Sequence, residues 1–111
     1  MDESIRTIDS DGTITYRNSA GELHRIDGPA VEFTNGTKFW YFNQQLHRIG
    51  DPAVERANGT KYWYLNGQCH RTDGPAVEHT NGDKEYWYKD KQITKRTYLS
   101  KKFQVQMVME L

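Results

Sequence analysis

The stretch His24-Arg25-Ile26-Asp27-Gly28-Pro29-Ala30-Val31-Glu32 decides the architecture of this chain. It returns with small changes at residues 47–55 and again at residues 70–78, so the spacing is 23 residues each time. Repetition at a fixed period of this length is typical of arrays in which each supersecondary unit buries apolar surface against its neighbours. The sequence therefore predicts a repeat protein.

Each unit also carries an Asn-Gly dipeptide between two strand-forming runs. Val31 to Phe33 precedes Asn35-Gly36, and the aromatic run 38–42 follows it, which is a strong hairpin signal. A second chain reversal follows at residues 43–45, and Pro29 stands where the next strand begins or at a sheet edge. We therefore expect an all-β fold, a twisted antiparallel meander of β-hairpin repeats.

With 111 residues, the chain is long enough for one domain. We divide it into a partial unit at 11–25, full units at about 26–48, 49–71 and 72–95, and a C-terminal cap at 96–111. The cap can be interpreted as a helix that begins after Thr94 and aligns Leu99, Phe103 and Met107, or as a strand with alternating apolar residues. We favour the helix, because the repeat histidine is lost at the place where the array needs a cap.

The terminal units depart from the pattern. In the first unit Tyr16 takes the tryptophan position, and Ser19-Ala20-Gly21 lengthens the second turn by one residue. In the last unit Glu85 is interpreted as an insertion before Tyr86-Trp87-Tyr88, and Thr94-Lys95 replaces the expected His-Arg pair. The single cysteine, Cys69, stands at the position of Leu23 and Leu46, which predicts a buried small hydrophobe.

Alternation along the aromatic strands predicts two faces. Tryptophans 40, 63 and 87 would share one face and form the core, while tyrosines would occupy the other face, half-buried or available for binding. The candidate binding residues are these tyrosines together with the repeated arginines: Tyr41, Tyr62, Tyr64, Tyr86, Tyr88, Arg25, Arg48 and Arg71.

The repeated arginines have a structural interpretation and a functional one. Each has an aspartate two or three residues on, as in Arg25 with Asp27. This spacing favours an ion pair across the turn formed by Asp-Gly-Pro, or by Gly50-Asp51-Pro52, which we call the corner. Arginines left free could instead bind phosphate or carboxylate groups. In the middle unit Gly50-Asp51 reverses the usual order, so its turn, and its arginine with it, should be arranged differently.

Several classes of function are disfavoured. Equivalent histidines would lie about 9.6 Å or more apart on strand spacings of about 4.8 Å, whereas zinc ligands lie about 2.0 Å from the metal. We therefore expect no metal and no cofactor. The chain has no phosphate-binding loop and no catalytic triad context, and a residue type repeated three times suits a scaffold better than an active site, so we expect no enzyme.

The repeat His-Arg-x-Asp-Gly-Pro-Ala-Val-Glu, with Asn-Gly-Thr-Lys and an aromatic-Trp-Tyr run, resembles repeats in small uncharacterised proteins of tailed bacteriophages and large DNA viruses. It is also distantly similar to MORN-type β-hairpin repeats. The resemblance covers residues 11 to about 95. It implies a phage accessory protein that binds a host factor, with no catalytic or ligand-binding residue carried over.

These observations lead to three functional hypotheses. The first is a non-enzymatic module that binds and inhibits or redirects a host protein, such as a defence protein, in the host cytoplasm. The second is a nucleotide or nucleic-acid binder with bases on tyrosines and phosphates on the arginines, although the net charge of zero weakens it. The third is a structural or assembly component. The N-terminal residues lack a signal-peptide pattern, no apolar stretch is long enough for a membrane span, and exposed sheet edges would allow a homodimer.

Overall fold

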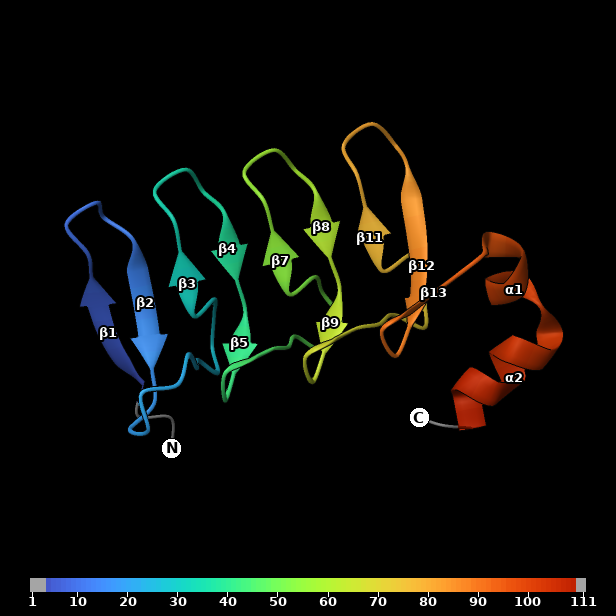
Figure 1. The fold of residues 1–111 in the computed structure, drawn as a ribbon, viewed down its shortest axis with the longest axis horizontal. Coiled ribbons are helices and arrows are strands. Elements are labelled where there is room, and N and C mark those ends of the chain that lie inside the picture. The colour runs from blue at the N-terminus through green and yellow to red at the C-terminus, as the bar shows by residue number, and fades with distance from the viewer. Residues whose placement is uncertain (1–3, 110–111) are drawn as a thin grey trace.

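Four hairpins standing side by side make up most of the molecule (Figure 1). The structure, a computed structural model, describes residues 4–109, and the molecule is a thin slab of 49 × 33 × 18 Å. The hairpins form a nine-stranded antiparallel sheet with the order β1-β2-β3-β4-β7-β8-β11-β12-β13. Its strands are β1 (Ile5–Ile8), β2 (Ile14–Arg17), β3 (Val31–Glu32), β4 (Lys38–Phe39), β7 (Val54–Glu55), β8 (Lys61–Tyr62), β11 (Val77–Glu78), β12 (Lys84–Tyr88) and β13 (Lys91–Ile93). The predicted all-β meander is confirmed.

A second row of small hairpins follows strands β4 and β8 along the chain. β5 (Tyr41–Phe42) pairs with β6 (Gln45–Leu46), and β9 (Tyr64–Leu65) pairs with β10 (Gln68–Cys69). Their turns hold consecutive residues at positive φ, Asn43 and Gln44 in the first and Asn66 and Gly67 in the second. Two successive positive φ values are what a two-residue hairpin turn of type I′ requires, and Asn and Gly adopt them most easily.

The Asn-Gly dipeptides predicted as hairpin turns do form the turns of the larger hairpins. Only the glycine takes a positive φ there, +96° at Gly36, while the Asn35 side chain accepts a hydrogen bond from the Thr37 backbone N–H. Phe33 N–H donates to the Thr37 carbonyl, which closes the turn. The side chain and the glycine thus play different parts in the same turn.

Strand pairing fixes which residues share a face, and it corrects the expected register of the last unit. Val54 pairs with Tyr62 within one hairpin, and Val77 pairs with Glu85 within the next, so Glu85 is not an insertion but occupies the position of Tyr62. Consequently Tyr86 takes the tryptophan position and Trp87 takes that of Tyr64. Ile93-Thr94, not Thr94-Lys95, stands in place of the His-Arg pair. The two predicted faces are therefore exchanged in this unit, because a slip of one residue reverses every side chain of a strand.

The core is a narrow seam along the sheet. Ala30, Ala53 and Ala76 are fully buried, and each is followed by a buried valine. In the unit of residues 49–71, Trp63 and Cys69 join the seam, which confirms Cys69 as a buried small hydrophobe. Burial, reinforced by the charge of Asp90, raises the pKa of its thiol to about 12. The thiol is therefore protonated and unreactive at neutral pH.

The C-terminal segment is helical, as favoured, and consists of α1 (Lys95–Leu99) and α2 (Lys101–Met109). The Thr94 hydroxyl oxygen accepts a hydrogen bond from the Thr97 backbone N–H and caps α1. Extended backbone at Ser100 separates the two helices, so the predicted alignment of Leu99 with Phe103 and Met107 is wrong. Leu99 is exposed, whereas Met107 is buried.

Candidate binding surfaces

One face of the slab carries three arginine clamps, each formed by an arginine stacked on a ring. The guanidinium carbons of Arg25, Arg48 and Arg71 each lie 3.9 Å from a ring centroid, over Tyr16, Trp40 and Trp63 respectively. We call this side the clamp face. Tyr16 thus takes the tryptophan position, as predicted.

The third clamp shows how completely an arginine is engaged. Arg71 Nη1 donates to the Pro75 carbonyl at 3.0 Å and to the Glu78 carboxylate at 3.1 Å, while its Nε pairs with Asp73 at 2.9 Å. The same partners recur around Arg25, with Asp27, Pro29 and Glu32. The predicted pairing of arginine with aspartate is confirmed. The additional glutamate and proline carbonyl leave the guanidinium little capacity for an external phosphate.

The corner glycine makes room for the clamp. A Cβ at Gly74 would lie 2.8 Å from Arg71 Cζ, so a larger residue would displace the guanidinium. At the second corner the reversed Gly50-Asp51 order places Gly50 at a φ of +84°. Asp51 there pairs with Arg48 Nη2 at 3.8 Å, whereas Asp27 and Asp73 pair with the Nε of their arginines at 3.0 and 2.9 Å. The prediction that this corner differs is confirmed.

The repeated histidines connect successive units. Nδ1 of His24 accepts a hydrogen bond from the Asn43 backbone N–H, and His47 and His70 do the same for the next turns, at 3.0 and 2.9 Å. These are structural contacts. Within residues 4–109, no group of three or more His, Cys, Asp or Glu side chains is arranged to hold a metal ion.

The opposite side of the slab is an aromatic face. Its upper row alternates valine with a larger residue, in the order Val31, Phe39, Val54, Tyr62, Val77, Glu85. Its lower row brings Tyr41 and Tyr64 beside Leu46 and Cys69. We define the aromatic face by its larger side chains: Phe33, Phe39, Tyr41, Tyr62, Tyr64 and Trp87.

Side chains on the aromatic face remain partly open to solvent. Phe33 is 41% exposed and packs edge-on against Phe39, with ring centroids 5.7 Å apart. Arg56, which is exposed, lies over the Tyr62 ring at 5.4 Å. A shallow hollow lies between Phe39, Leu46, Arg56 and Tyr64. Partial burial raises the pKa of Tyr64, which therefore stays neutral.

The five candidate tyrosines do not form one surface. Tyr41, Tyr62 and Tyr64 lie on the aromatic face, but Tyr86 and Tyr88 lie on the clamp face, so the expected single row is wrong. The C-terminal helices cover both: the Tyr98 ring packs on Tyr86 in a tilted arrangement, with centroids 4.7 Å apart, and the Phe103 ring meets Tyr88 edge-on at 5.1 Å. Tyr98 thus takes the place of the arginine that the last unit lacks.

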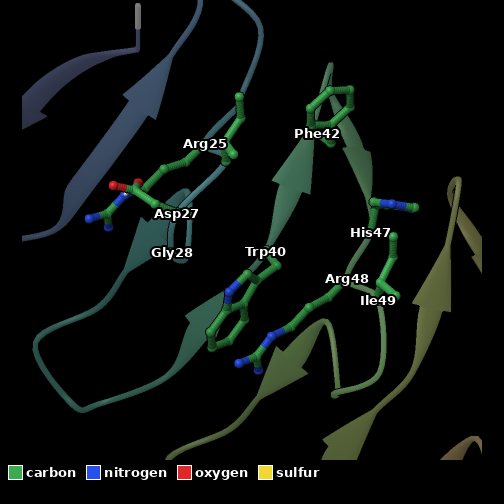
Figure 2. Close-up of a pocket in the computed structure, with 9 residues that line it drawn as sticks. Arg25, Asp27, Gly28, Trp40, Phe42, His47, Arg48 and Ile49 are labelled. Carbon is green, nitrogen blue, oxygen red and sulfur yellow. Dashed lines mark hydrogen bonds and ion pairs between the residues drawn. The ribbon is translucent and has the colours of Figure 1, made fainter. Parts of the chain in front are cut away.

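The clamp face also holds a groove between the first two corners (Figure 2). It measures about 700 Å³ and is lined by Ile26, Asp27, Phe42 and Ile49, with the Arg48 and Trp40 stack beside them. Ile26 and Ile49 are 62% and 79% exposed. Sequence reasoning missed this groove. The available signal was an isoleucine in an otherwise polar corner, at the variable position of His-Arg-x-Asp-Gly-Pro.

None of the helices between residues 4 and 109 is both long and apolar enough to cross a membrane. Comparison of the chain with protein-family models, with curated proteins and with solved structures finds no match in any of the three.

Proposed function

We propose that this chain is a non-enzymatic module that binds a partner protein through its aromatic face. The observation that carries the proposal is a continuous aromatic and aliphatic surface, two rows deep, that stays partly solvent-accessible on a single-layered sheet. Tyrosine, tryptophan and arginine are the side chains most enriched at the energetic centres of protein interfaces. An exposed apolar patch of this kind is typical of an interaction site.

The clamp arginines argue against the nucleotide alternative. The guanidinium groups of Arg25 and Arg71 each already pair with two carboxylates and a backbone carbonyl. A nucleic-acid ligand would have to break these pairs before its phosphates could be bound. The resemblance of the repeat to phage and viral proteins instead suggests a protein of the infected host cell as the partner.

Affinity capture from a bacterial lysate with matched variants tests the proposal. The test variant combines Phe33→Ser with Arg56→Glu, two exposed positions on the aromatic face. The control is Ile8→Ser, which is 56% exposed on β1 and, by its pairing with Ile14, lies on the side of the sheet opposite to the aromatic face. We expect one stoichiometric partner that the wild type and the control retain and the test variant loses. Capture of the same protein by all three, or of no protein, would overturn the proposal.

A further inference from the structure

The shallow hollow on the aromatic face lies at a junction between two repeats, where β4 of one hairpin pairs with β7 of the next (Figure 1). It measures about 200 Å³ and is lined by Phe39, Leu46, Val54, Arg56, Tyr62 and Tyr64. Pockets that hold a whole small ligand usually measure about 300–1,000 Å³. This hollow is smaller, so it suits one side chain of a larger partner.

Arg56 is the one charged side chain in this lining, and no carboxylate balances it. Its guanidinium lies over the Tyr62 ring at 5.4 Å and forms no ion pair with any residue from 4 to 109. Each clamp arginine, by contrast, pairs with two carboxylates. An exposed guanidinium beside apolar surface favours a partner that brings its own carboxylate.

The next junction on the same face already contains such a carboxylate. His79 stands at the repeat position of Arg56, and Glu85 stands at that of Tyr62. Glu85 Oε2 lies 2.7 Å from His79 Nε2, and Glu85 Oε1 accepts a hydrogen bond from Trp87 Nε1 at 3.0 Å. One carboxylate thus contacts a basic side chain and a ring donor there, and the equivalent place beside Arg56 lacks it.

Tyr64 supplies the second half of the equivalent place. It stands at the repeat position of Trp87, and partial burial raises its pKa, so its hydroxyl keeps its proton and offers a donor. Asp90 also acts on Tyr64, but it already accepts a hydrogen bond from the Cys69 backbone N–H at 2.9 Å and does not pair with Arg56. The chain therefore presents a cation and a donor here without supplying their acid.

We propose that the hollow binds an acidic apolar segment of the partner protein, in which one aliphatic or aromatic side chain enters the hollow and an adjacent carboxylate pairs with Arg56. This inference rests on the proposed function and adds the chemistry of the partner. The carboxylate of the partner takes the place that Glu85 holds at the next junction. The charge of the segment then determines specificity, while the aromatic rows supply contact area.

Selection from a yeast-displayed library of random peptides tests the proposal on the full chain. Peptides enriched by the wild type should carry Asp or Glu beside an aliphatic or aromatic residue. Arg56→Glu changes an exposed side chain, so folding should be preserved, which circular dichroism checks. It should lower the affinity for these peptides at least about tenfold, or about 1.4 kcal/mol. Arg6→Glu makes the same charge change beside Tyr16 on the clamp-face side and should leave the affinity unchanged.

An exchange of charge gives the decisive result. Replacing the acidic residue of a selected peptide by lysine should abolish binding to the wild type and restore it with Arg56→Glu. Enriched peptides without an acidic residue, affinities that Arg56→Glu does not change, or no enriched peptide at all would overturn this inference. In each of these cases, loss of the lysate partner from the Phe33→Ser and Arg56→Glu double variant would still support the proposed function, so the two failures are distinguishable.

Discussion

Replacing Arg71 by alanine tests whether the clamps hold the repeats together. The guanidinium lies over the Trp63 ring and bonds to the Pro75 carbonyl and the Glu78 carboxylate, and the side chain is only 19% exposed. Stacking on tryptophan contributes about 1 kcal/mol, and the two charge-assisted hydrogen bonds together add about 1–3 kcal/mol. The pair with Asp73 adds little, because that carboxylate is 78% exposed. We expect Arg71→Ala to lower the free energy of unfolding by about 2–4 kcal/mol.

Arg56→Ala is the matched control. Arg56 also lies over a ring, that of Tyr62, but at 5.4 Å and on an exposed position. Its loss should cost at most about 0.5–1 kcal/mol. Arg71→Lys keeps the charge but not the planar fork, so it should fall between the two alanine variants.

Urea unfolding, followed by tryptophan fluorescence and far-ultraviolet circular dichroism, measures these differences. The dependence of the unfolding free energy on urea should be equal among the variants, since the same surface is exposed on unfolding. If Arg71→Ala and Arg56→Ala differ by less than about 0.5 kcal/mol, the clamp acts only as a surface ion pair and the reasoning is wrong.

Three further predictions use the same unfolding assay. Gly74→Ala should destabilise the wild type by about 1–2 kcal/mol but cost little in the Arg71→Ala background, since the three atoms nearest to the added Cβ all belong to the Arg71 guanidinium. Tyr98→Phe should cost about 1 kcal/mol and keep the helical signal, because the hydrogen bond to the third corner is lost and the ring stacking is retained. Glu85 has its pKa lowered, first by a hydrogen bond from His79, so it stabilises the fold above the ordinary glutamate pKa and this stabilisation is lost as the pH falls. Glu85→Gln should remove that part of the acid dependence, and an unchanged acid profile would contradict the assignment.

The turns and the strand order were predictable because they depend on local residues. Asn-Gly, Asp-Gly-Pro and the aromatic runs specify conformations within a few residues, and the period of 23 residues orders the units. Of each clamp, only the pairing of the arginine with its aspartate was predictable. Arg48 and Asp51 are close in the sequence, but Trp40, between β4 and β5, and Glu55, in β7, also contact the same guanidinium. No pattern of neighbouring residues indicates that these side chains meet at one guanidinium.

The register of the last unit shows why the candidate binding surface was harder to predict than the fold. Aligning Tyr86-Trp87-Tyr88 with Tyr62-Trp63-Tyr64 by residue type moves the strand by one position, whereas counting 23 residues from Trp63 leads to Tyr86. The pairing of Val77 with Glu85 supports the count. Because side chains alternate between faces, this single step carries two candidate tyrosines from the aromatic face to the clamp face. There the chain's own helices occupy them, so the surface open to a partner contains the tyrosines of the two middle units and Trp87.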